Sequence, residues 1–226
     1  MTGPEFRYEH EMTPVVEQWL VDGGLQVKRE YSTPWGVLDL IGLKFNTENV
    51  EKRKELGQRL PIGPIRRIAL LLKIADEDDG RATNFASLTR QFRLWMEAQE
   101  IEEHLQTLEE RKFITFKSPS RVVKRNGWYP LHDRLVSVEL KLSRVSEVVR
   151  QAKTNLSLSG ESYIGLPSTL VRRVSGARLE ELRLAGLGLL SVTRSTCEVV
   201  VKARSNDKGD ELMAAHCGER FWREFV

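Results

Sequence analysis

The sequence predicts an α/β protein in which helices flank a mixed β-sheet core and a smaller α+β subdomain is inserted into that core. Apolar residues recur at helical spacing in several segments, and alternating strand-like segments lie between them. In the last third of the chain the order strand, helix, strand, helix, strand requires crossover connections between parallel strands. A block of helical and β-like segments separates the first strands from these later ones.

Each element follows from its local pattern. The N-terminal region predicts a helix over 12–22, ended by Gly23 and Gly24, and two strands over 25–32 and 37–45, followed by a polar linker over 46–62. The later elements are, in order, helices over 63–80, 84–94 and 96–112, two β-like segments within 113–129, a strand over 136–142, a helix over 144–160, a strand over 161–167, a helix over 176–186, two strands within 187–203 and a helix over 209–225. We therefore expect three blocks: a first core part (1–60), an insertion (61–129) and a second core part (130–226).

Composition limits the class of protein. With 226 residues, 40% hydrophobic and 30% charged, the chain has the composition of a soluble globular protein. It contains no apolar run of membrane-spanning length and no signal-peptide pattern, so we expect no membrane association and a cytoplasmic location. The two cysteines, Cys197 and Cys217, lack metal-ligand spacing, which argues against a zinc site.

Charge is distributed unevenly along the chain. Residues 111–153 carry eleven Lys or Arg against three acidic residues, whereas residues 76–110 carry ten acidic residues against three Arg. The basic stretch favours a polyanionic partner and the acidic stretch disfavours one.

Two strands carry acidic residues at unusual positions. In the strand over 136–142, Glu139 and Lys141 share one face, opposite a face of valine and leucine. Asp39 interrupts an almost continuous apolar strand over 37–45. One interpretation is that these charges are solvated on half-exposed strands. The alternative is that they bind a metal ion, because a buried carboxylate requires a partner.

The arrangement of these residues resembles the PD-(D/E)XK nuclease superfamily. Its plan is a helix with a glutamate, a hairpin with an aspartate, an E-x-K strand and a helix that often carries Gln-Ala. The matching residues here are Glu11, Asp39, Glu139, Lys141 and Gln151, in that order. For the helix glutamate, Glu9 and Glu17 remain alternatives to Glu11.

The resemblance covers residues 8–45 and 130–203, so the block between them is an insertion. The residue before Asp39 is Leu38 rather than the proline of the family name, a departure that leaves the ligand position intact. The resemblance implies a restriction-endonuclease-like core and a metal-dependent nuclease, with DNA as the favoured substrate and RNA as the alternative. The competing hypothesis is a catalytically weak or inactive module that uses this fold for DNA binding or assembly.

The resemblance also implies a role for each residue. Asp39, Glu139, the backbone carbonyl of Leu140 and Glu11 would bind Mg²⁺ or Mn²⁺, since oxygen ligands suit these hard cations. The ion would activate a water that attacks the phosphodiester. Lys141 would orient that water or stabilise charge on the phosphate, and Gln151 would contact the active site or a phosphate.

The inserted block, with three helices and a β-hairpin, resembles a winged helix, a variant of the helix-turn-helix module. Its third helix, over 97–110, carries many glutamates that would face phosphates of like charge, so we expect that it does not read DNA in the usual manner. It is a candidate surface for a protein partner or a second copy of the chain, and the alternative is an ordinary solvated helix face. Contacts to a nucleic-acid backbone are expected instead from the basic residues that follow that helix, which are Lys117, Arg121, Lys124, Arg125 and Arg144.

Overall fold

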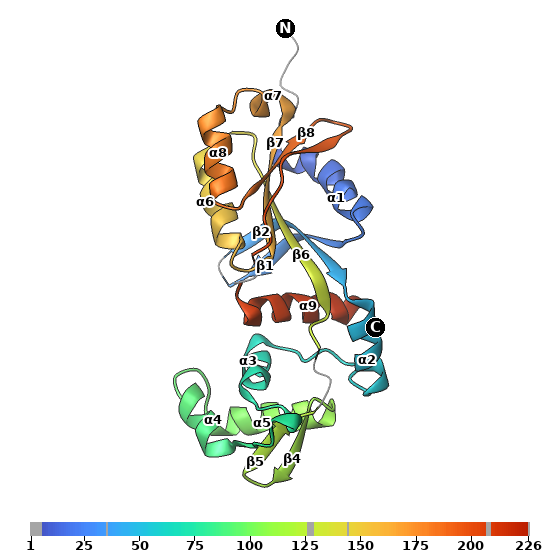
Figure 1. Cartoon of the computed structure of the whole chain (residues 1–226), viewed down its shortest axis with the longest axis vertical. Helices are drawn as coiled ribbons and strands as arrows, with labels where there is room; N and C mark the ends of the chain where they lie inside the picture. Colours follow the sequence, from blue (N-terminus) through green and yellow to red (C-terminus); the bar gives the residue numbers. More distant parts are fainter. Residues whose placement is uncertain (1–5, 35, 126–128, 144, 207–208, 226) are drawn as a thin grey trace. The chain divides into compact units, whose positions relative to one another are not determined.

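The computed structural model describes residues 6–34, 36–125, 129–143, 145–206 and 209–225 (Figure 1). The chain forms two compact units. We call Met1–Phe45 together with His132–Asp210 the first unit, and Asn46–Leu131 together with Glu211–Val226 the second unit.

The first unit is built on a six-stranded mixed sheet. Its strands, in spatial order, are β1 (Gln26–Thr33), β2 (Gly36–Phe45), β6 (His132–Leu140), β7 (Glu161–Pro167), β8 (Gly188–Val192) and β9 (Cys197–Val201). The pairs β6–β7 and β7–β8 are parallel, whereas the other neighbours are antiparallel. The predicted mixed sheet with flanking helices is therefore confirmed.

Helices cover both faces of this sheet. They are the 3₁₀ helix η1 (Glu9–Met12), α1 (Thr13–Asp22), α6 (Val145–Asn155), α7 (Ser168–Val171) and α8 (Gly176–Leu184). In Figure 1, α1 lies on one side of the sheet and α6 and α8 lie on the other. Val136 and Val138 of β6 pack in the cluster that contains α1 residues, and Ile164 of β7 packs in the cluster that contains α6 and α8 residues. Because both faces are covered, a charged side chain on either face of β6 enters the interior.

The second unit combines helices with a small antiparallel sheet. Its elements are α2 (Thr47–Glu55), α3 (Ile65–Lys73), the 3₁₀ helix η2 (Glu77–Asp79), β3 (Thr83–Asn84), α4 (Phe85–Phe92), α5 (Ala98–Glu110), β4 (Ile114–Ser118), β5 (Arg121–Lys124) and α9 (Glu211–Phe225). The strand order is β3-β5-β4. Its core contains Ile68 of α3, Leu88 of α4 and Leu105 of α5, and Leu212 and Ala215 of α9 pack against it.

The division of the chain differs from the predicted blocks, because α2 and α9 belong to the second unit rather than to the sheet core. A buried ion pair explains this. Arg53 of α2, fully buried, donates to Glu219 of α9 over 2.5 Å, and Glu219 also accepts the N–H of Ile62 over 2.6 Å. The Arg53 guanidinium carbon lies 4.9 Å from the ring centroid of Phe113 and 5.5 Å from that of Trp222. These contacts join segments that the sequence pattern treats as separate.

None of the helices in the described residues is long and apolar enough to cross a membrane.

We predict that Arg53→Met destabilises the protein by about 3–5 kcal/mol, because it leaves the carboxylate of Glu219 buried without its cation. Adding Glu219→Gln should recover most of this loss, since glutamine still offers an acceptor to Ile62. Urea denaturation checks both variants. Lys54→Met, on the exposed side of the same helix, is the control and should change the unfolding free energy by less than about 0.5 kcal/mol. A double variant less stable than Arg53→Met would contradict the argument.

Candidate metal and catalytic site

The two unusual carboxyl groups meet at the end of the β2–β6 pair. The antiparallel register places Leu40 opposite Val138, so Asp39 and Glu139 are the next residues on the two strands. Asp39 Oδ2 accepts the backbone N–H of Leu140 over 2.7 Å. The carboxyl groups of Asp39 and Glu139 lie close enough to share a hydrogen bond. The structure thus brings together two residues that are one hundred positions apart in the sequence.

Glu139 lies in the interior, with 2% of its surface exposed. Its Oε1 accepts the side-chain N–H of Asn155 over 2.7 Å, and Asn155 itself is buried in α6. Burial, and then the charge of Asp39, raise the pKa of Glu139 to about 7, although Asn155 and Lys141 oppose the shift. The interpretation of Glu139 as a solvated strand residue is therefore wrong.

Asp39 shares this environment. Burial raises its pKa, the Leu140 N–H and Lys141 act in the opposite direction, and Glu9 adds to the rise. Two adjacent carboxyl groups in a desolvated position repel each other when both are ionised, so they favour a shared proton or a cation. Leu140, whose carbonyl is a predicted ligand, lines the same cleft of about 910 Å³ as Asp39 and Glu9.

Lys141 is held by Glu9. Its Nζ lies 2.9 Å from Glu9 Oε2, and the other oxygen of Glu9 lies 3.4 Å from the backbone N of Leu142. Burial lowers the pKa of Lys141, but the bond to Glu9 and the charges of Asp39 and Glu139 outweigh it and raise that pKa overall. Lys141 is consequently a fixed cation beside the two carboxyl groups and does not serve as a proton acceptor at neutral pH.

The structure separates the three candidate helix glutamates. Glu11, predicted as a metal ligand, directs its carboxylate to the backbone N–H groups of Arg7 and Tyr8, over 2.6 and 3.2 Å, and these bonds lower its pKa. It caps η1 and does not join the site. Glu17 pairs with Arg29. Glu9, the remaining alternative, is the one that reaches Lys141.

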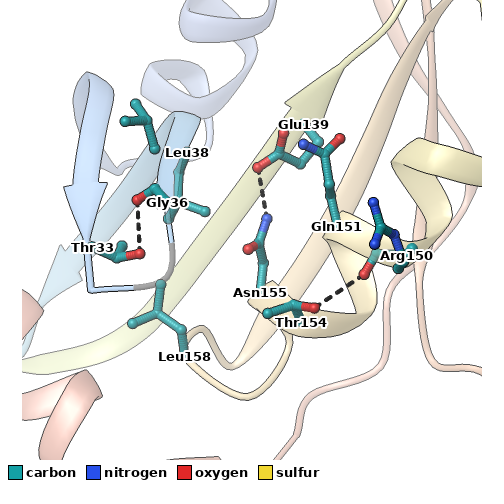
Figure 2. A pocket seen from close by; sticks show the side chains of 10 residues that line it. Thr33, Gly36, Leu38, Glu139, Arg150, Gln151, Thr154, Asn155 and Leu158 are labelled. Carbon is teal, nitrogen blue, oxygen red and sulfur yellow. Dashed lines mark hydrogen bonds between the residues drawn. The ribbon is translucent and has the colours of Figure 1, made fainter.

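Gln151 lies on α6 and lines a second cleft, of about 340 Å³, together with Glu139 and Asn155 (Figure 2). Its Oε1 is buried and has no hydrogen-bond partner among the described residues. An uncompensated carbonyl oxygen near a buried carboxyl group fits a cation or a donor from a ligand. Asn155 was missed by the sequence analysis, although its spacing of four from Gln151 places both side chains on one helix face.

The predicted nucleic-acid contacts are only partly available. Lys124 is 9% exposed and its Nζ lies 3.3 Å from Asp76, so it is a buried partner of an acid rather than a surface cation. Lys117 forms an ion pair of 2.6 Å with Glu77. Arg121 is exposed and Arg125 is half-buried. Arg144 lies outside the described residues.

The donor set fits a hard cation. The candidate ligands are the carboxylates of Asp39 and Glu139 and the neutral oxygens of Leu140 and Gln151, all of the type that Mg²⁺ and Mn²⁺ prefer. Within the described ranges, no group of three or more His, Cys, Asp or Glu side chains is arranged so that these side chains alone could hold a metal ion. The neutral oxygens would therefore have to complete the coordination begun by the two carboxylates.

The raised pKa of Glu139 predicts a pH-dependent stability. Between pH 4.5 and about 7 the folded protein keeps a proton on Glu139 that the unfolded chain has released, so the unfolding free energy should fall as pH rises through this window. Glu139→Gln should remove this dependence and stabilise the metal-free protein at pH 8 by on the order of 2 kcal/mol.

Calorimetric unfolding from pH 4 to pH 8 checks this, with the exposed Glu198→Gln as the control. A slope that persists in Glu139→Gln at its full size would show that another group is responsible.

No protein-family model matches the chain, and no curated protein or solved structure matches it either.

Proposed function

We propose that this protein is a Mg²⁺- or Mn²⁺-dependent nuclease that hydrolyses phosphodiester bonds in DNA, and that the first unit is a restriction-endonuclease-like core of the PD-(D/E)XK type. One observation carries the proposal: the carboxyl groups of Asp39 and Glu139 are adjacent, and the ammonium group of Lys141 interacts electrostatically with both. The order of elements around them supports it, with a helix before the hairpin and α6 after the Glu139 strand.

The acidic and basic residues of the site have different roles in the proposed reaction. Glu139, with a pKa of about 7, would give up its proton when a cation binds, because a carboxyl group coordinates a metal ion as the carboxylate. A bound Mg²⁺ would supply Lewis-acid activation of the phosphate and of water. Lys141 stays protonated and can stabilise the negative charge that develops on the phosphate oxygens. Glu9 positions that ammonium group, and Asn155 holds the Glu139 carboxylate.

We also propose that the second unit contains a winged helix. The order α3, β3, α4, α5, β4, β5 and the sheet order β3-β5-β4 support this. The exposed face of α5 carries Glu102 and Glu103, so α5 is proposed to face a protein partner or a second copy of the chain rather than DNA. Arg121, at the start of β5, is exposed and is proposed to contact a nucleic-acid backbone.

A second candidate function is a binding or assembly module with little or no catalytic activity. The ion pair between Lys141 and Glu9 favours it, because a neutralised ammonium group stabilises an anionic transition state less well. Cleavage assays distinguish the two functions.

We predict that the protein cleaves DNA when Mn²⁺ or Mg²⁺ is added, and that Lys141→Ala lowers the rate by about 10²- to 10³-fold while the fold is retained. The measurement is a panel of single- and double-stranded DNA and RNA substrates, with circular dichroism to verify folding. Lys153→Ala, an exposed lysine on α6, is the matched control. Equal cleavage by Lys141→Ala would refute the role of Lys141, and no cleavage of any substrate by the wild type would favour the binding module.

The three glutamates give a further prediction. Glu9→Gln should reduce cleavage by about 10- to 100-fold, because it releases the ammonium group of Lys141 from its position. Glu11→Gln and Glu17→Gln should leave the rate close to that of the wild type, since their carboxylates bind Arg7, Tyr8 and Arg29 instead. The measurement is the cleavage rate of each variant at a temperature where all of them are folded. A larger loss of rate in Glu11→Gln than in Glu9→Gln would show that Glu11, and not Glu9, positions Lys141.

A further inference from the structure

The second unit contains a cleft of about 800 Å³ whose ionisable lining is mostly basic. It is lined by Arg67 of α3, by Arg111 immediately after α5, and by His216 and Arg220 of α9. The acidic residue that lines it, Glu219, already accepts from Arg53 and from the N–H of Ile62. Among the described residues, Glu219 is therefore engaged by Arg53 and Ile62 and not by Arg67 or Arg111.

Two guanidinium groups converge in this cleft on a neutral acceptor. Nη1 of Arg67 donates to the carbonyl oxygen of Ile62 over 2.9 Å, and Nη1 of Arg111 donates to the same oxygen over 3.3 Å and also to Pro61. Burial and the charge of Arg111 lower the pKa of Arg67, while Glu110 acts against this. Two like charges so close together are stabilised by an anion.

Unsatisfied nitrogen atoms also lie in the residues of this cleft. Arg67 Nε and His216 Nδ1 are buried and have no hydrogen-bond partner among the described residues. Buried donors without an acceptor are costly, and they mark places where a ligand or an ion is missing. Gly63 leaves room for the guanidinium, since a Cβ at this position would lie 2.7 Å from Arg67 Nη1.

We infer that this cleft binds an organic phosphate of about nucleotide size. Arginine guanidinium groups match phosphate oxygens with paired donors, and the N-terminus of the nine-residue helix α3, which follows Gly63 and Pro64, adds a favourable field. The cleft is far larger than a phosphate ion. Its apolar lining of Leu60, Pro61 and Pro64 offers a surface for the organic part of the ligand.

The shared chemistry is a phosphate attached to a nucleoside, and it has two sources: a free mononucleotide or the phosphorylated end of a nucleic-acid strand. Isothermal titration calorimetry of the full chain, in the presence of a chelator, compares adenosine 5′-monophosphate, adenosine, and a short oligonucleotide with and without a 5′-phosphate. Both phosphorylated probes should bind, and adenosine should not. Tighter binding of the phosphorylated oligonucleotide identifies the strand end, and tighter binding of the mononucleotide identifies the free nucleotide.

Arg67→Gln should weaken binding by roughly tenfold or more. Arg66→Gln is the matched control, because Arg66 is its neighbour on α3 but is exposed and pairs with Glu100. Because binding is measured with a chelator present and requires no cleavage, failure of the nuclease proposal leaves this inference intact. Binding that is equally weakened in Arg66→Gln, or absent for every phosphorylated probe, would overturn it.

A measurement on the wild type tests the inference without any variant, so it does not depend on whether Arg67→Gln folds. Titration of adenosine 5′-monophosphate should shift the ring signals of His216 in a proton–carbon correlation spectrum. Saturable binding that leaves the signals of His216 unchanged would place the ligand elsewhere and refute the inference.

Discussion

The structure of the first unit depends on compensating a carboxyl group inside its sheet. Glu139 projects from a strand whose two faces are both covered by helices, and an unpaired charge in that position is strongly unfavourable. Two side chains meet this requirement in part: Asn155 from α6 donates to Glu139, and Lys141 adds a positive charge. Asp39 from β2 lies beside Glu139 and acts against its ionisation. The positions of α6 and of the β2–β6 pair are thus linked to one side chain.

Asn155 and Lys141 offset only part of the cost of ionising Glu139 inside the protein. Asn155 and Lys141 lower the pKa of Glu139, yet burial and Asp39 still raise it to about 7. A protein selected for stability alone would replace one of the two acids by a neutral residue of similar size. Two adjacent carboxyl groups beside an ammonium group that Glu9 keeps in place are typical of catalytic and binding sites, where the surroundings shift the pKa values of ionisable side chains.

Local patterns in the sequence predicted most strands and helices, because side-chain periodicity is a local property. The preference for Glu11 over Glu9 assumed α-helical spacing. The structure places both residues in the 3₁₀ helix η1, which has about three residues per turn, so their side chains point in other directions than an α-helix would give. The two compact units differ from the predicted blocks because the ion pair of Arg53 and Glu219 joins residues 166 positions apart, and no local sequence pattern predicts such a contact.

Charge runs were the least reliable guide to the second unit. The basic and acidic stretches of the sequence neutralise each other in part, since Lys117 pairs with Glu77 and Lys124 lies against Asp76. In the cleft of the second unit, by contrast, Arg67 and Arg111 donate to backbone carbonyl oxygens, and these two arginines belong to separate segments that form no basic run. The proposed binding of a phosphate by this unit therefore depends on where the fold brings single arginines together, and the distribution of charge along the chain does not predict it.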